Sequence, residues 1–319
     1  MTALFRRALL SDYFVLGLCA LYAAAVAPFT PGFITAGNFA NILATMLPLL
    51  LAALGQTVVL IAGGIDLSTS AIIGLTSIVG AMVMNDDTGW LARSPLAAIA
   101  GVAAMVGLGA MVGAFNGLGV TRGRMPPFMV TLASMMGFSG LAVWLTHSKA
   151  INALPATFTL LGGRTAVACG LVLAVAALAH LMLSRSLFGR WLYAVGHNPR
   201  AALISGVPVA GIVFSAYVLC GVLAALAAVL YTAQAETGSP VLGQRVLLDV
   251  IGATVIGGTS LFGGKGKVLW TVFGVLLLKL IDNSLNLLSL SIFTITMTKG
   301  AVILLAACLD SARARLGAT

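Results

Sequence analysis

The last two apolar segments of the chain contain three ionisable side chains, in surroundings where charge is expensive. Lys279 and Asp282 stand three residues apart, so they share one face of a helix, and Lys299 lies in the following segment. A turn near residues 289–291 would bring Asp282 and Lys299 to a similar depth on the two arms of a hairpin. Intramembrane charges either relay protons or pair to hold helices together. Because an unpaired charge is the costlier arrangement, we predict a structural ion cluster.

Asp66 is a second candidate, since a carboxylate at the centre of a bilayer costs about 2.5–3.5 kcal/mol and would mark a functional site. The alternative is a helix N-cap. With Leu67 and Ser68 opening the next helix, Asp66 would accept hydrogen bonds from the exposed N–H groups and complement the helix dipole. The predicted topology places Asp66 nearer the cytoplasmic boundary than the midplane, which favours the cap.

Known catalytic motifs do not fit this sequence. The glycines around Lys265 suggest a phosphate-binding loop, but a Walker A loop requires Gly-Lys followed by Ser or Thr, and here Gly266 follows. The chain lacks an HExxH zinc pair and a GxSxG nucleophile turn, and its three histidines, His147, His180 and His197, are far apart. We therefore expect a non-enzyme subunit with no metal site and no cofactor.

Composition identifies the surroundings of these side chains. Hydrophobic residues make up 60% and charged residues 8% of the 319 residues, and mean hydropathy is +1.10. Apolar runs of about 18 or more residues recur throughout, as in an integral membrane protein. No polar block is long enough for a separate soluble domain, so residues 1–319 are expected to form one membrane domain. The net charge of +9 does not indicate nucleic-acid binding, because the basic residues stand singly at the ends of apolar runs.

The predicted fold is all-α and polytopic, with about ten transmembrane helices and both termini in the cytoplasm. Lys and Arg concentrate on one predicted side, which the positive-inside rule assigns to the cytoplasm. The residues on that side are Arg6, Arg7, Arg122, Arg124, Arg185, Arg190, Arg200, Lys265, Lys267, Arg313 and Arg315. By the length rule the spans are roughly 14–27, 43–62, 69–84, 95–119, 126–145, 165–184, 210–232, 247–262, 268–287 and 293–309.

Two glycine pairs interrupt the helical pattern at membrane depth. Gly63 and Gly64 precede Asp66, and Gly257 and Gly258 follow another short apolar run; each pair has a polar residue two positions on and then Leu. Non-helical backbone is tolerated in a bilayer only where protein or a water-filled cavity covers it, and a transport path is such a cavity. Paired breaks of this kind also occur in transporters built from internal repeats, an alternative that the pattern leaves open.

A polar segment, residues 196–207, is set between two long apolar runs and must lie in water. Asn198 can cap the exposed N–H groups of a helix that starts at Pro199, and Gly206 followed by Pro208 provides a stop. We predict one short interfacial helix. Its exposed face is available to another protein.

The chain resembles the ribose-type permeases of bacterial ABC importers, which are related to branched-chain amino-acid permeases. The likeness runs from about Asn38 to Asp310 and departs from the family near Leu247, where an acid is usual. Five stretches in order carry it: AGGIDLS from Ala62, PPFMVTL from Pro126, YAVGHNPRAALISGV from Tyr193, DVIGATVIGGTSLFGGKG from Asp249 and NSLNLL from Asn283.

The resemblance implies a multi-pass permease in the bacterial inner membrane. It also implies two cytoplasmic ATP-binding subunits, a second permease copy or a sister permease, and a periplasmic sugar-binding protein as partners. In such importers a cytoplasmic helix between spans docks on the ATPase and passes its closure to the membrane helices. The residues matching that helix and its flanks are Gly196, Asn198, Ala201, Ala202, Ser205 and Gly206.

A path for a neutral, hydroxyl-rich solute needs hydrogen-bonding side chains without a deep charge trap. The candidates, whose alternative role is hydrogen bonding between helices, are Asn116, Phe128, Thr131, Asn283 and Asn286. Two rival functions are an ion-coupled secondary carrier working alone, which would need titratable groups such as the ion cluster, and a permease for another small polar solute.

Overall fold

A computed structural model describes residues 12–317, and regular structure in that range is helical apart from one isolated bridge between Ile151 and Gly238. The topology residues Arg6 and Arg7, and the side chains of Arg313 and Arg315, lie outside the described residues. In chain order the elements are α2 (Phe14–Val26), η1 (Ala27–Phe29), α3 (Ala36–Ile61), α4 (Thr69–Met84), α5 (Ala97–Thr121), α6 (Pro127–Thr146), α7 (Ala156–Gly163), α8 (Thr165–Arg185), α9 (Leu187–His197), α10 (Pro199–Ile204), α11 (Val209–Ala235), α12 (Val246–Gly257), α13 (Val268–Leu287) and α14 (Ile292–Gly317).

The chain is an all-helical, polytopic membrane protein, as its composition predicts. Six helices, α3, α5, α6, α8, α11 and α13, are long and apolar enough to cross a membrane. Four shorter apolar segments, α2 with η1, α4, α12 and the first part of α14, coincide with the remaining predicted spans. Two further helices, α7 and α9, were not predicted because each is too short to show as an apolar run.

Two predicted boundaries are wrong, for local reasons. The span predicted at 43–62 begins earlier, at Ala36, because Thr35 Oγ1 accepts from the Asn38 N–H group (3.2 Å) and caps the first turn. The span predicted at 247–262 is too long, because α12 ends at Gly257. The next residue, Gly258, has a φ of +109°, which turns the chain out of the helix.

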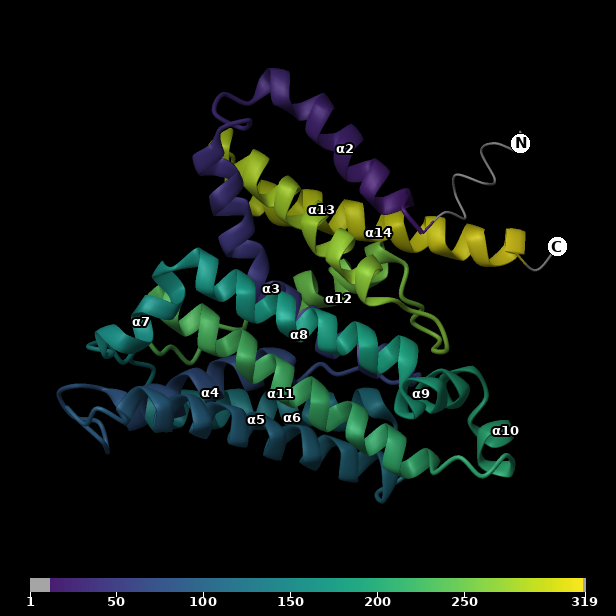
Figure 1. Cartoon of the computed structure of the whole chain (residues 1–319), viewed down its shortest axis with the longest axis horizontal. Helices are drawn as coiled ribbons and strands as arrows, with labels where there is room; N and C mark the ends of the chain where they lie inside the picture. Colours follow the sequence, from purple (N-terminus) through teal and green to yellow (C-terminus); the bar gives the residue numbers. More distant parts are fainter. Residues whose placement is uncertain (1–11, 318–319) are drawn as a thin grey trace.

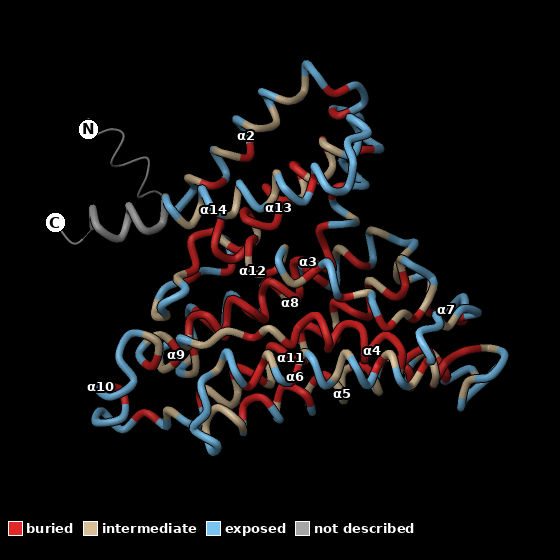
Figure 2. The backbone as a smooth tube through the Cα atoms, turned by 180° about the vertical axis from the view of Figure 1, so that it is seen from behind, coloured by how far each residue is buried: buried red, intermediate tan, exposed pale blue. Residues whose placement is uncertain are grey.

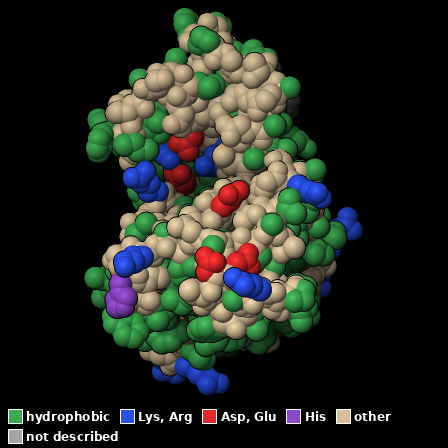
Figure 3. Space-filling model, turned by 90° about the vertical axis from the view of Figure 1, so that its left-hand side faces the viewer, with side chains coloured by type: hydrophobic (Ala, Val, Ile, Leu, Met, Phe, Trp, Pro, Cys, Tyr) green, Lys and Arg blue, Asp and Glu red, His purple; other side chains and the backbone are tan. Residues whose placement is uncertain are grey.

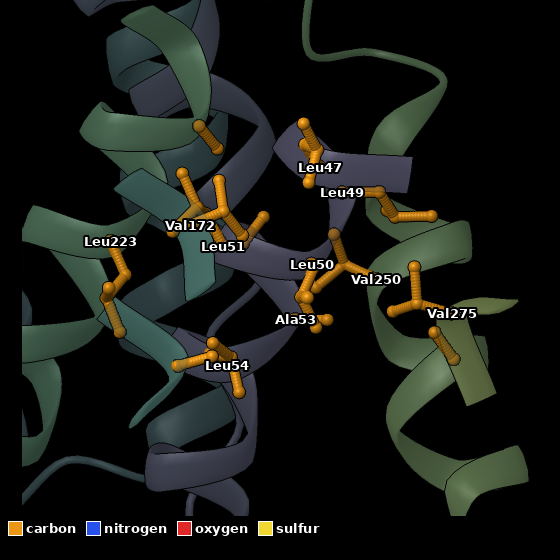
Figure 4. Packing of buried hydrophobic residues seen from close by; sticks show 14 of the residues in the cluster. Leu47, Leu49, Leu50, Leu51, Ala53, Leu54, Val172, Leu223, Val250 and Val275 are labelled. Carbon is orange, nitrogen blue, oxygen red and sulfur yellow. The ribbon is translucent and has the colours of Figure 1, made fainter. Parts of the chain in front are cut away.

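Helix α3 is the centre of the packing. Its residues from Met46 to Ile61 are all buried. Figure 4 shows Leu51 and Leu54 on the side of α8 and α11, and Leu49 and Leu50 on the side of α12 and α13. In lipid, such burial stabilises mainly through van der Waals packing, because the surrounding acyl chains are as apolar as the core.

Helices α5 and α11 pack along a seam of small residues. Gly109, Gly113 and Gly117 recur every four residues on α5, so they lie on one face. A methyl group at Gly113 would lie 2.4 Å from the Tyr217 carbonyl oxygen of α11, and one at Gly109 would lie 2.5 Å from the Gly221 carbonyl oxygen. Glycine at these positions therefore allows the two backbones to approach closely.

The helices form two groups with α3 between them. Helices α4, α5, α6 and α11 lie on one side, and α2, α12, α13 and α14 lie on the other (Figure 1). Buried backbone is concentrated around α3, α4 and α11, whereas α2 and α10 are largely exposed (Figure 2). The start of α2, the end of α14, and α9 and α10 share one end of the molecule, and α7 lies at the opposite end (Figure 1). The start of α2 and the end of α14 therefore lie on the same side of the molecule.

Candidate functional site

The first glycine break is a Schellman motif at the end of α3. Gly63, with a φ of +81°, donates to the Leu60 carbonyl oxygen (2.9 Å), and Gly64 donates to the Val59 carbonyl oxygen (3.0 Å). A methyl group at Gly64 would lie 2.5 Å from the Tyr217 hydroxyl oxygen. Gly63 is therefore needed for its backbone conformation, and Gly64 for the space it leaves to α11.

The second break is also a Schellman motif, at the end of α12. Gly258 donates to the Val255 carbonyl oxygen (2.9 Å), and the N–H group of the next residue, Thr259, donates to the Thr254 carbonyl oxygen. Gly257 is still helical, and a methyl group there would lie 2.3 Å from the Trp270 carbonyl oxygen of α13. If the two Gly-Gly pairs are aligned, Gly63 corresponds to Gly257. In the structure, however, the residue with the same backbone role as Gly63 is Gly258.

Asp66 lies fully buried in the segment that joins α3 to α4. Its Oδ1 atom accepts from both the N–H group and the hydroxyl group of Ser68 (2.8 and 2.6 Å), and the amide of Gln56 pairs with the Asp66 peptide group. Helix α4 begins at Thr69 with Ser68 as its N-cap residue. The prediction that Asp66 is the N-cap residue is wrong, because its carboxylate bends forward over Ser68 in an Asx turn.

Two predicted path residues belong to the same buried network. Asn116 of α5 is fully buried, donates to Ser68 Oγ (2.7 Å) and accepts from the Ser134 hydroxyl group of α6. Thr131 of α6 is also buried and donates to the Ile65 carbonyl oxygen (3.3 Å). The hydrogen bonds between helices that we considered as the alternative role are therefore present at both residues, and they tie α5 and α6 to the first break.

The other three path candidates lie apart from this network. Phe128 is half exposed on α6. Asn283 of α13 exchanges two hydrogen bonds with Asn38 of α3 (2.7 and 2.8 Å). Asn286 is exposed, and its amide donates to the Asp282 carbonyl oxygen (2.6 Å). The structure thus divides the candidates between α5–α6 and α13 and does not bring them together.

The interfacial helix is α10, with the predicted ends. Asn198 Oδ1 accepts from the N–H groups of Arg200 and Ala201 (3.1 Å each), and Pro199 occupies the first helical position. At the other end Gly206, with a φ of +81°, forms a third Schellman motif.

Not every residue predicted for the docking surface faces outward. Asn198, Ala201, Ser205 and Gly206 are exposed, but Ala202 is buried, as is Val207, whose N–H group donates to the Ala202 carbonyl oxygen in the Schellman motif. The outward-facing apolar side chains are Leu203 and Ile204, 63% and 88% exposed. Sequence reasoning missed them because it searched for small residues.

Gly196 faces the interior, where α9 meets the end of α3 and the loop between α12 and α13. A methyl group at Gly196 would lie 1.7 Å from the Ile61 carbonyl oxygen, and that oxygen accepts from the Gly264 N–H group (2.9 Å). A methyl group at Gly263 would lie 2.7 Å from the Gly196 carbonyl oxygen and 2.9 Å from Gly63 Cα. We call this three-way contact of Gly196, Gly63 and Gly263–Gly264 the glycine junction.

One side-chain hydrogen bond reinforces the glycine junction. The Tyr193 hydroxyl group of α9 donates to the Gly266 carbonyl oxygen (2.7 Å). Burial raises the pKa of Tyr193, so the hydroxyl group stays protonated and available as a donor. Helix α9 is thereby held to the loop between α12 and α13, residues 258–267, by backbone contact and by a side chain.

The ion cluster contains a fourth member that sequence reasoning did not include. Lys299 Nζ lies 3.1 Å from Asp282 Oδ1, the predicted pair, and 2.8 Å from Asp249 Oδ1. Lys279 Nζ lies 3.5 Å from Asp282 Oδ2. These four residues, the tetrad, join α12, α13 and α14 and carry no net charge. The signal for Asp249 was an acid inside an apolar run, 50 residues before Lys299.

The tetrad side chains are 13–19% exposed. Figure 3 shows acidic and basic side chains gathered in a hollow on the face that lies at the left-hand end of Figure 1. That end is opposite to the end with α9 and α10. A hollow with paired charges thus lies at one end of the molecule, and a capped, exposed helix lies at the other.

Comparison with known proteins finds permease components of transport systems. The family model described as "Branched-chain amino acid transport system / permease component" matches residues 38–307. The ribose import permease protein RbsC of Bacillus subtilis is 40% identical over 288 residues, 88% of this chain and 86% of that protein. RbsC of Escherichia coli K12 is 34% identical over 90% of each chain, and the L-arabinose transport system permease protein AraH of the same strain is 33% identical over 94% of this chain and 90% of AraH. No solved structure matches the chain significantly.

Proposed function

Because the chain belongs to the family of branched-chain amino acid transport system permease components, we propose that it forms the membrane path of an ATP-driven sugar importer in the bacterial inner membrane. The relatives named for ribose and L-arabinose favour a monosaccharide. The partners would be two cytoplasmic ATPase subunits, a second permease copy or a sister permease, and a periplasmic binding protein that delivers the sugar.

The observation that carries the proposal is the glycine junction. Helix α10 follows α9 directly, and α9 contacts the end of α3 and the loop 258–267 through Gly196. A displacement of α10 would therefore reach the end of α3 and, through Gly263 and Gly264, the loop that joins α12 to α13. Closely packed backbone transmits such a displacement because it has little room to absorb it.

The tetrad supports a structural role over proton relay. Lys299 is bonded to two carboxylates, and each charge in the group has a partner of opposite sign within 3.5 Å. Paired charges of this kind hold helices together, whereas a proton relay needs a group that changes its charge during the cycle. We propose that the tetrad fixes α12 and α14 to α13 beside the solute path.

The solute path itself is proposed to run beside α13 and the first break. Asn283, Asn286, Asn116, Thr131 and Phe128 would supply hydrogen bonds and an apolar face to a sugar ring. Their present hydrogen bonds, Asn283 to Asn38 and Asn116 to Ser68, would exchange for sugar hydroxyl groups as the helices move.

Reconstitution tests the proposed function. The purified chain is placed in liposomes alone, or together with its ATPase and binding-protein partners, and uptake of labelled ribose and arabinose is measured with and without ATP. We expect uptake only with the complete set and ATP, since the chain lacks a Walker A loop. Gradient-driven uptake by the chain alone would contradict an ABC importer and favour a secondary carrier.

A further inference from the structure

The loop between α12 and α13 presents an apolar side chain with no cover. Phe262 is 94% exposed and its neighbour Leu261 is 46% exposed, while the glycines around them are packed against α9. A bare phenylalanine at the tip of an ordered loop is unfavourable in water. An apolar surface of a partner placed over Phe262 would remove this area from water.

This loop is continuous with the interfacial helix. A methyl group at Gly264 would lie 3.1 Å from His197 Cα, two residues before the first residue of α10, and Gly264 also bonds Ile61. Figure 1 shows the loop beside α9, at the same end of the molecule as α10. Phe262 and the exposed pair Leu203–Ile204 thus stand on two segments held together by the glycine junction.

Basic side chains outnumber acidic ones around these segments. Arg190 lies in α9, Arg200 is the second residue of α10, and Lys265 and Lys267 follow Phe262 in the loop. Lys267 pairs with Asp12 but keeps half of its side chain exposed, and both lysines lie over the Trp270 ring. A partner would need an apolar depression with an acidic rim.

We propose that Phe262 is a second anchor for the cytoplasmic ATPase subunit, which binds the loop 258–267 and α10 as one composite surface. The inference rests on the proposed function and adds to it. The ATPase would hold α10 on one side of the glycine junction and the loop on the other, so nucleotide-driven closure would act on the end of α3 and on the loop at once. A buried aromatic side chain at such a position is a typical hot spot of a protein interface.

Site-specific photocrosslinking tests this anchor without a destabilising change. A benzophenone amino acid replaces Phe262, Ile204 or Phe29 in the permease, co-expressed with an ATPase subunit identified by mass spectrometry and by its Walker A sequence. Phe29 is the matched control, because it is a phenylalanine of similar exposure (76%) beyond the far end of α2. We expect ATPase adducts from positions 262 and 204 and none from position 29.

The outcomes separate the inference from the proposed function. An ATPase adduct from position 204 with only lipid or permease adducts from position 262 would overturn the second anchor and leave the importer standing. Absence of ATPase adducts at both positions, with no copurifying ATPase, would overturn the importer itself.

A substitution series measures the strength of the anchor. Phe262→Asp should weaken ATPase association with the solubilised complex by about 30-fold, as expected for a buried hot-spot aromatic. The corresponding Phe29→Asp variant should bind the ATPase normally, and Phe262→Leu should retain most of the affinity. Equal binding by wild type and Phe262→Asp would refute the inference.

Discussion

Removal of the Lys299 charge is the sharpest test of the tetrad. Lys299 Nζ lies 2.8 Å from Asp249 and 3.1 Å from Asp282, and these side chains are less than one-fifth exposed. The variant Lys299→Met keeps the apolar stem but removes the ammonium group bonded to Asp249 and leaves that carboxylate beside Asp282. Breaking a buried pair in this way costs about 3–5 kcal/mol, and partial exposure places the expectation near about 3 kcal/mol.

The structure also identifies the rescuing change. In the double variant Lys299→Met with Asp249→Asn, one charge of each sign is removed, and the Lys279–Asp282 pair remains. We expect this variant to regain about 2 kcal/mol, leaving it within about 1 kcal/mol of wild type. The exchange of Asp282→Lys with Lys299→Asp, which the sequence alone suggests, should restore little, because a carboxylate at position 299 would face Asp249.

The free energy of unfolding can be followed by tryptophan fluorescence during SDS titration in mixed micelles, with membrane expression as a second readout. The matched control is Asp249→Asn alone, which leaves Lys299 bonded to Asp282 and should lose less than Lys299→Met. If the Lys299→Met/Asp249→Asn double variant is as unstable as the sum of the two single variants, the two residues do not interact and the reasoning fails.

Three other outcomes follow from the packing and the caps. Gly113→Leu should prevent folding, because even a methyl group there would lie 2.4 Å from the Tyr217 carbonyl oxygen. Gly107→Leu, on the open face of α5, should express normally. Similar expression yields for the two variants would contradict the close packing of α5 on α11. Asn198→Ala should remove two capping hydrogen bonds, destabilise α10 by about 1 kcal/mol and lower ATP-driven uptake. Asn198→Asp should retain both hydrogen bonds. Transport assays and limited proteolysis at α10 would measure these effects. Tyr193→Phe should leave expression unchanged but raise ATP hydrolysis that is not accompanied by transport, since it loosens the glycine junction; full coupling in this variant would remove its assigned role.

Local features of this chain follow from sequence because they depend on neighbours along the backbone. Residues 196–208 specify a capped helix with a glycine stop, since Asn198, Pro199 and Gly206 act within a few residues of themselves. The apolar runs specify membrane helices for the same reason, because each run has to satisfy its backbone groups internally. Even so, the sequence could not show which of Gly257 and Gly258 ends the helix. Both residues are glycine, and glycine can occupy either the last helical position or the left-handed position after it.

Tertiary structure decided the contacts between distant segments. Asp249 joins Lys299 across 50 residues, and Gly196 meets Gly63 and Gly263 from two other parts of the chain. The fully buried Asn116 and the inward-facing Ala202 were assigned from residue type, which cannot tell a helix face that lines a path from one that packs on a neighbour. Sequence periodicity defines which residues share a face, but only the packing of the helices around α3 determines what each face meets.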